Sequence, residues 1–187
     1  MIFNSHSDLE GKHAFLSASQ SSWLNYDLEH LTSRWKNERA KQEGTELHAL
    51  AEQLIRKKRK LRGNDTLSMY VNDAIGFHLE PEVLLFYSYN AFGTADAIRY
   101  DEKKHFLRIH DLKTGVTKVH MEQLMVYAAL FCLEYNVKPT DIDIELRIYQ
   151  NNEIQTCIPE AEDIIDIMDI IVTFDNHIDK LREEEGV

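Results

Sequence analysis

Asp111 and Lys113 are the pair of residues whose types and spacing predict chemistry most directly. On a β-strand, residues two apart point to the same face, so this carboxylate and this ammonium emerge side by side. A buried carboxylate in a sheet is costly unless it is paired or binds a cation. The pair fits a site in which Asp111 binds a divalent metal and Lys113 orients or deprotonates a water. The alternative is a simple salt bridge at the end of a strand.

A second carboxylate, Asp96, is expected on the preceding strand. The two strands, Gly93 to Tyr100 and His105 to Lys113, are separated by the polar segment 101–104, which predicts a hairpin. Antiparallel pairing about this loop brings Asp96 close to Asp111. Two neighbouring carboxylates repel each other unless a hard cation such as Mg²⁺ or Mn²⁺ neutralises them. Two unrelated surface Asp residues are the alternative.

His48 is the third candidate. It lies near the start of a helix expected from Gly44 to Arg62, where apolar residues recur at spacings of three and four. Its place upstream of the two carboxylates makes it a candidate metal ligand, with Glu46 or Glu52 as the next carboxylate candidate. The alternative is a structural or exposed histidine. The pattern His-Glu-x-x-His is absent from the sequence, so a helical zinc peptidase has little support.

Gln123 and Tyr127 lie one turn apart on a helix expected from about Lys118 to Tyr135, with Asn136 and Pro139 ending it. This helix follows the strand that carries the Asp-x-Lys pair. Side chains of these two types can hydrogen-bond a phosphate or hold other groups of a site. The alternative is a helix that packs on the sheet through its other side chains.

The remaining elements complete an α/β pattern. β-Formers and alternating residues predict further strands, and apolar residues at helical spacing predict further helices. These elements are a short helix from about Gln20 to Leu31, strands from Val83 to Tyr89 and from Ile142 to Tyr149, and an acidic helix from Pro159 to about Glu184. Neither an internal repeat nor a linker is evident, so we expect one domain, residues 1–187, with a central mixed sheet flanked by helices.

The net charge of −11 is mostly a property of the C-terminal segment. Residues 153–187 contain eleven acidic and two basic residues, so the preceding 152 residues carry a net charge of only −2. Within that part, six basic residues fall in seven consecutive positions: Arg56, Lys57, Lys58, Arg59, Lys60 and Arg62. The run is a candidate contact for nucleic-acid phosphates, or else the solvated end of a helix whose dipole it complements.

Cysteine content and hydropathy exclude other classes. Cys132 and Cys157 are too few for a cysteine-only zinc site or a four-cysteine iron–sulfur cluster, and we expect reduced thiols. The sequence contains neither a signal peptide nor an apolar stretch long enough to span a membrane. We therefore expect a cytoplasmic protein without a membrane partner.

Four motifs, in this order along the chain, resemble those of the PD-(D/E)xK nuclease superfamily: Gly44…His48, Gly93-x-x-Asp96, Asp111-x-Lys113 and Gln123-x-x-x-Tyr127. The branch that they resemble contains the RecB-type nuclease domain and related phage exonucleases. Residues 16–19, 23–25 and 44–52 are similar to small phage and prophage members of that branch. The resemblance covers roughly residues 14–150 and leaves the acidic C-terminal helix outside it.

This resemblance implies a restriction-endonuclease-like fold with an α-β-β-β-α-β core and a site at one edge of the sheet. It implies that Mg²⁺ or Mn²⁺ is bound by His48, Asp96, Asp111 and the backbone carbonyl of Leu112. It also implies that Lys113 helps to activate a water, and that Gln123 and Tyr127 support the site and contact the DNA backbone. A bound metal that polarises a phosphate and lowers the pKa of its water is suited to in-line attack.

The function that the resemblance implies is metal-dependent hydrolysis of DNA, by an exonuclease of phage or prophage recombination or DNA processing in a bacterial or phage-infected cell. Two alternatives remain open: an endonuclease or junction resolvase on the same fold, and a module that binds nucleic acid or a partner without cleaving. The chain lacks a P-loop sequence. Processive action would therefore need a ring-like homo-oligomer or a separate recombination or single-strand-binding protein.

Overall fold

The computed structural model describes residues 14–115 and 120–185. Contacts along the chain divide it into two compact units, Met1–Glu43 and Gly44–Val187. The first unit contains the 3-10 helix η2 (Ala18–Asn25) and the first part of helix α1 (Leu28–Arg56), which continues into the second unit. The sheet and all residues of the predicted metal site belong to the second unit.

The N-terminal helices differ from the prediction. In place of one helix from Gln20 to Leu31, η2 ends before α1 begins, and α1 begins at Leu28 rather than at Gly44. Asp27 caps α1, because its carboxylate accepts the N–H of His30 at 2.7 Å. This cap starts the helix early, and Gly44 lies inside it.

The sheet is mixed and has five strands in the order β1-β2-β3-β4-β5. Neighbouring strands pair antiparallel except β3 and β4, which are parallel. The strands are β1 (Glu80–Ser88), β2 (Ala91–Asp101), β3 (Phe106–Leu112), β4 (Asp143–Gln150) and β5 (Glu153–Cys157). The prediction of an α/β fold with a central mixed sheet is confirmed.

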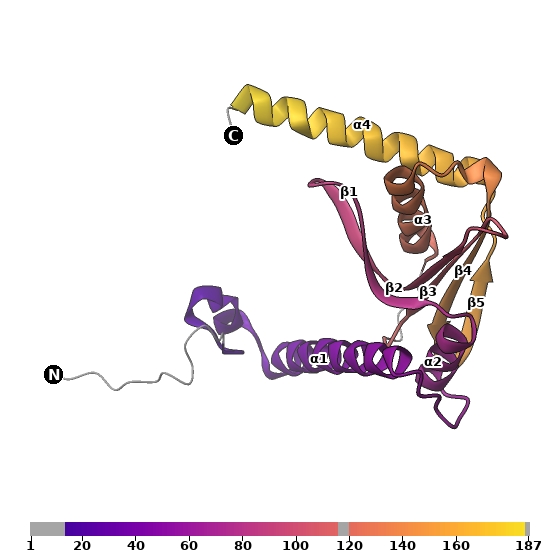
Figure 1. Ribbon diagram of the computed structural model, residues 1–187. Helices are drawn as coiled ribbons and strands as arrows, with labels where there is room; N and C mark the ends of the chain where they lie inside the picture. The colour runs from indigo at the N-terminus through magenta and orange to yellow at the C-terminus, as the bar shows by residue number, and fades with distance from the viewer. Residues whose placement is uncertain (1–13, 116–119, 186–187) are drawn as a thin grey trace, which may run out of the picture. The chain divides into compact units, whose positions relative to one another are not determined.

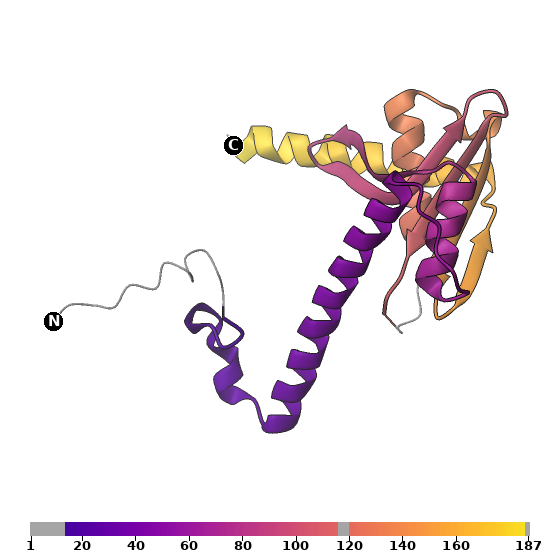
Figure 2. The same ribbon diagram turned by 60° about the horizontal axis from the view of Figure 1, so that its bottom comes forward.

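Helices cover both faces of this sheet (Figures 1 and 2). Helix α2 (Thr66–Gly76) packs on β3 and β4 on one face, and α3 (Glu122–Tyr135) packs on β1 to β4 on the other. Helix α4 (Ala161–Glu185) packs on α3, with the 3-10 turn η3 (Pro139–Asp141) beside it. None of the helices within the described ranges is long and apolar enough to cross a membrane.

Alternation along β3 sends its side chains to two separate cores. Leu107 and Ile109 are fully buried on the α3 side, whereas His110 and Leu112 are buried on the α2 side. Asp111 shares the parity of Leu107 and Ile109 and therefore faces α3. The pleat of one strand thus places the predicted catalytic carboxylate beneath the helix that carries Gln123 and Tyr127.

Two elements were not predicted, α2 and β5. Asp65, three residues after the expected end of the first long helix at Arg62, caps the start of α2. Its carboxylate accepts the N–H of Ser68 at 3.0 Å and the hydroxyl of Ser68 at 2.6 Å. Helix α2 buries Tyr70, Val71 and Ala74 against the sheet.

The helix expected to reach Arg62 ends at Arg56. Lys58 adopts a left-handed conformation, with φ of 52°, and the N–H groups of Lys58 and Arg59 bond to carbonyls of the last helical turn. Asn72 of α2 then fixes the loop by accepting the N–H of Leu61 at 2.9 Å and donating to its carbonyl at 3.0 Å. Five of the six residues of the basic run therefore lie in a loop rather than on a helix.

The C-terminal limit of α3 agrees with the prediction. The helix ends at Tyr135, and Asn136 takes the left-handed conformation with φ of 55°. The predicted start at Lys118 lies outside the described residues. The last helix begins at Ala161, two residues after the predicted Pro159.

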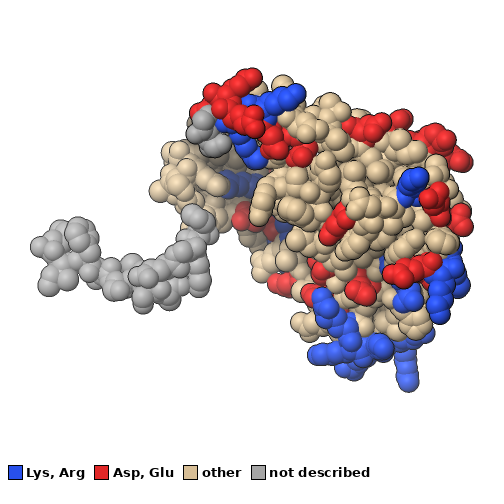
Figure 3. All heavy atoms as spheres, turned by 45° about the horizontal axis from the view of Figure 1, so that its top comes forward, with Lys and Arg blue, Asp and Glu red and all other residues tan. Residues whose placement is uncertain are grey.

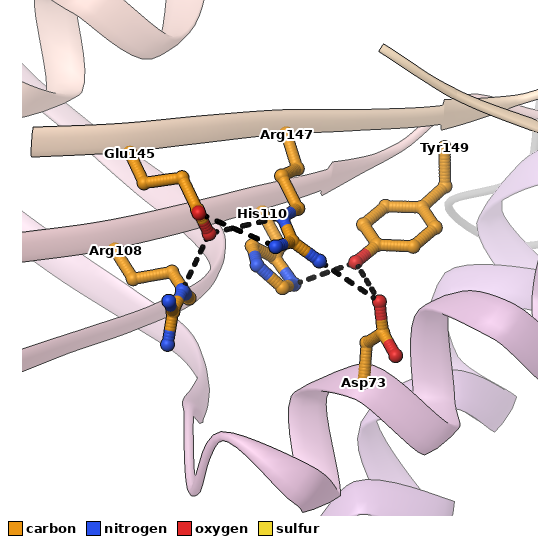
Figure 4. Close-up of polar contacts among 6 residues, drawn as sticks. All are labelled: Asp73, Arg108, His110, Glu145, Arg147 and Tyr149. Carbon is orange, nitrogen blue, oxygen red and sulfur yellow. Dashed lines mark hydrogen bonds and ion pairs between the residues drawn. The ribbon is translucent and has the colours of Figure 1, made fainter. Parts of the chain in front are cut away.

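A polar network, partly buried and centred on His110 and Tyr149, crosses the α2 face of the sheet (Figure 4). Tyr149 donates its only hydroxyl proton to Asp73 at 2.7 Å, so His110 Nδ1 must carry the proton of its 3.2 Å contact to the Tyr149 oxygen. His110 is fully buried, and Arg147 continues the network from Asp73 to Glu145. Burial, with repulsion from Arg147, holds the pKa of His110 well below its ordinary value of 6.5.

Because His110 stays neutral in the folded protein, we expect the free energy of unfolding to fall in acid. The folded protein keeps His110 neutral, whereas the unfolded chain takes up its proton as the pH falls through 6.5. Between pH 7.5 and 5.5 we expect the wild type to lose about 1.4 kcal/mol of unfolding free energy relative to His110→Phe. Urea denaturation at both pH values measures it, with exposed His177→Gln as the control. Equal pH slopes for wild type and His110→Phe would contradict the assignment.

Candidate metal site

Asp96 lies where β2 separates from β3. The last paired residues of the two strands are Ala97 and His110. The next residue outward is Asp96 on β2 and Asp111 on β3. The Oδ2 atom of Asp96 accepts the N–H of Leu112 at 2.9 Å and lies 3.4 Å from Nδ1 of His48. The predicted proximity of the two hairpin carboxylates follows from this register.

His48 reaches the sheet from the second half of α1. Within the second unit, Gly44 allows α1 to approach the segment that follows β3, because a Cβ atom there would lie 2.8 Å from the Thr114 hydroxyl. His48 is one helical turn farther along and is partly buried. The Gly44…His48 spacing thus combines a close approach of the backbone with an imidazole that lies beside Asp96.

Glu82 completes the group and was not predicted. It is opposite Asp96 in the β1–β2 pairing, between the pairs formed by its two neighbours, and its φ is 52°. A non-glycine residue in this left-handed region is strained, and such strain gathers at functional sites. One ligand atom from each of His48, Glu82 and Asp96 lies within 4.8 Å of the other two. The three residues form the carboxylate–histidine cluster.

A chain of hydrogen bonds joins Asp111, on β3, to two residues of α3. Lys113 Nζ lies 3.1 Å from both carboxylate oxygens of Asp111 and 2.8 Å from Oε1 of Gln123, to which it donates. Gln123 in turn donates from Nε2 to the hydroxyl of Tyr127 at 3.0 Å. Gly93 allows this packing, since a Cβ atom there would lie 3.0 Å from the Tyr127 ring. Four predicted site residues are thus joined in one chain.

The carboxylates of the site carry an unfavourable charge. Burial and then repulsion from Asp111 raise the pKa of Asp96 to about 6. Burial also raises the pKa of Asp111 and of Glu82. Asp111 Oδ2 is buried and accepts no hydrogen bond from the described residues, although Lys113 is nearby. Asp111 is buried, Asp96 is partly buried and Glu82 is exposed, and the repulsion between neighbouring carboxylates at this point fits a hard divalent cation.

The predicted ligand set is only partly assembled by direct contacts. The structure places His48 beside Asp96, whereas the nearest charged partner of Asp111 is Lys113. Leu112 reaches the site through its N–H, which binds Asp96. Glu52, one of the two further carboxylate candidates, pairs with Arg56 at 2.8 Å. Glu82, on β1, is the carboxylate that lies beside His48 and Asp96.

The basic run is exposed and begins beside the site. Lys57, Lys58, Arg59, Lys60 and Arg62 are all exposed, and the face drawn in Figure 3 has Lys and Arg gathered at its lower edge. Arg56 instead donates to the carbonyl of Pro81 at 3.2 Å, next to Glu82. Arg56 therefore holds the backbone of β1 next to Glu82. The other five basic residues are exposed and can contact solvent or a ligand.

Comparisons of this chain with protein-family models, with curated proteins and with solved structures give no match. The family resemblance of the motifs is therefore an interpretation of the sequence alone. The chemistry of the carboxylate–histidine cluster and of the hydrogen-bonded chain from Asp111 to Tyr127 is therefore the basis for inferring a function.

Proposed function

We propose that this protein is a Mg²⁺- or Mn²⁺-dependent deoxyribonuclease, an exonuclease rather than an endonuclease, whose metal is held by His48, Glu82 and Asp96. The observation that carries the proposal is the meeting of this cluster with the Lys113 chain. A salt bridge alone would not require a second, partly buried carboxylate, a strained glutamate and a histidine at the same point. The exonuclease assignment comes from the sequence resemblance.

The residues around the cluster have distinct tasks. A bound divalent metal would polarise the scissile phosphate and lower the pKa of a bound water. Asp111 and Gln123 hold the Lys113 ammonium in place, where it can orient a water or accept its proton after giving up its own. The Tyr127 hydroxyl accepts from Gln123, so its own proton remains available for a phosphate oxygen, and burial raises its pKa.

Cleavage of defined DNA substrates tests the proposal. End-labelled linear DNA and covalently closed circles are incubated with the protein in Mg²⁺, in Mn²⁺ and in EDTA. We expect metal-dependent loss of linear DNA with circles intact. Nicked circles would favour the endonuclease alternative, and no cleavage with either metal would overturn the proposal.

Glu82 provides a specific test of the cluster. We expect Glu82→Gln to weaken Mn²⁺ binding by about tenfold or more, because one ligand charge is lost. Calorimetric titration with Mn²⁺ measures the affinity. Glu80→Gln is the matched control, since Glu80 is an exposed glutamate two residues away on the same strand. Equal affinities for the two variants would remove Glu82 from the ligand set.

A further inference from the structure

A pocket lies at the ends of β2 and β3 that are far from the carboxylate–histidine cluster. It has a volume of about 390 Å³ and lies on the α2 side of the sheet. Its walls come from the end of α2, the β2–β3 turn and the two strands: Phe77, His78, Arg99, Lys104, Phe106 and Arg108. We refer to it as the arginine pocket.

The arginine pocket concentrates positive charge in a protein of net charge −11. Arg99 and Arg108 are direct partners in the antiparallel β2–β3 pairing, so both side chains stand on one face. Like charges in directly opposite positions destabilise a sheet. Lys104 adds a third cation from the turn. Glu145 offsets part of the Arg108 charge at 2.6 Å, and an anion in the pocket would offset the positive charge that remains.

The protein groups around the pocket only partly compensate this charge. Asp101 is the only acidic residue among the described residues that line it. Its Oδ1 atom accepts the backbone N–H groups of Lys103 and Lys104 at 3.2 and 3.3 Å, and its Oδ2 lies 4.0 Å from Lys104 Nζ. Arg99 donates one nitrogen to the carbonyl of His78 at 3.1 Å. An excess of cationic donors remains.

The Arg108 side chain is fixed in position and has hydrogen-bond donors that no described residue uses. Its Nε atom bonds to Glu145 Oε1 at 2.6 Å, and its guanidinium carbon lies 3.8 Å from the centre of the Phe77 ring. Arg108 stands at one end of the polar network, with a single nitrogen in a drawn contact (Figure 4). A guanidinium has five N–H donors, and within the described parts of the chain only the Nε donor of Arg108 is used. A stacked, fixed guanidinium loses little entropy when it binds an oxyanion.

We propose that the arginine pocket binds the phosphoryl group of a phosphate monoester. Such a group carries close to two negative charges near neutral pH and three acceptor oxygens, which match two guanidinium groups and an ammonium. The pocket is large enough to enclose the phosphate and part of the group that bears it. The site is separate from the metal cluster, and its existence does not depend on the proposed nuclease activity.

Calorimetric titration in EDTA and 0.15 M NaCl tests this site without a metal contribution. The probes are inorganic phosphate, AMP, adenosine, and a short oligonucleotide with or without a 5′-phosphate. We expect AMP to bind and adenosine not to bind. Binding of the phosphorylated oligonucleotide but not of AMP would assign the pocket to DNA ends, and binding of both would assign it to phosphate monoesters in general.

Matched charge variants separate a built pocket from general attraction. Arg99→Gln and Lys104→Gln should each weaken AMP binding by about tenfold, because each removes a charged donor. Lys103→Gln removes the same charge from the neighbouring turn position, which does not line the pocket, and should change the affinity less than twofold. No binding of any phosphorylated probe at 10 mM, or an equal loss in Lys103→Gln and Lys104→Gln, would overturn the proposal.

Discussion

On the proposed function, we expect Lys113→Met to lower the rate of metal-dependent DNA cleavage by about 10²- to 10⁴-fold, the range typical of a lost general acid–base group. Methionine keeps the length and apolar stem of the lysine but removes the ammonium that lies 2.8 Å from Gln123 and 3.1 Å from Asp111. Single-turnover cleavage of end-labelled linear DNA in Mn²⁺ measures the rate. Exposed Lys138→Met serves as the control and should cleave at the wild-type rate.

The same substitution has a predictable effect on stability, which separates folding from catalysis. It leaves the Asp111 carboxylate, of which 2% is exposed, without its counter-charge, and loss of one member of a buried pair is destabilising. Lys113→Met combined with Asp111→Asn should therefore melt at a higher temperature than Lys113→Met alone but remain inactive. Cleavage by folded Lys113→Met within threefold of the wild-type rate would exclude Lys113 from the reaction.

Asp96, Asp111 and their proximity were predictable because a short polar loop determines the register of a hairpin. The loop at 101–104 pairs Ala97 with His110, and the next residues on each strand are the two carboxylates. Gln123 and Tyr127 were predictable as a pair for a similar reason, since residues four apart share a helix face. Both pairs of residues are therefore predictable from local sequence features, a short loop in one case and helical spacing in the other.

Glu82 was not predictable from local pattern. Its place opposite Asp96 depends on the long-range pairing of β1 with β2 and on a left-handed backbone that the sequence does not signal at a glutamate. The expected strand began at Val83, three residues after the observed start at Glu80, and so did not include Glu82. Asp65 shows the opposite case, because an Asp at the start of a helix is a local cap signal, and yet α2 was not predicted.

Asp96→Asn is expected to stabilise the metal-free protein at neutral pH. The pKa of Asp96 rises from 3.8 to about 6 on folding, so the folded state holds this proton more tightly than the unfolded chain does. The ionised carboxylate therefore costs roughly 3 kcal/mol of unfolding free energy above pH 6, and the cost vanishes as the pH falls to 3.8. Asparagine can still accept the N–H of Leu112 and carries no charge.

Denaturant titration of both proteins at pH 7.5 and pH 5 measures this effect. The advantage of Asp96→Asn, up to roughly 3 kcal/mol at pH 7.5, should fall to about half at pH 5. Taking the difference between the two proteins cancels the opposite pH dependence of His110, which is present in both. Asp143→Asn, at an exposed carboxylate, is the control and should show no such advantage.

Mn²⁺ should reverse the order of stability. A ligand that binds only the folded state adds about 4.1 kcal/mol at a thousand times its dissociation constant, which exceeds the advantage of roughly 3 kcal/mol that Asp96→Asn has without metal. The wild type should gain this increment and Asp96→Asn should not, because the variant lacks the central carboxylate of the cluster. A variant that is less stable than the wild type in EDTA would instead make Asp96 a structural partner of His48 and Leu112. The sign of the stability difference between the two proteins, measured with and without the metal, therefore decides whether Asp96 is a metal ligand.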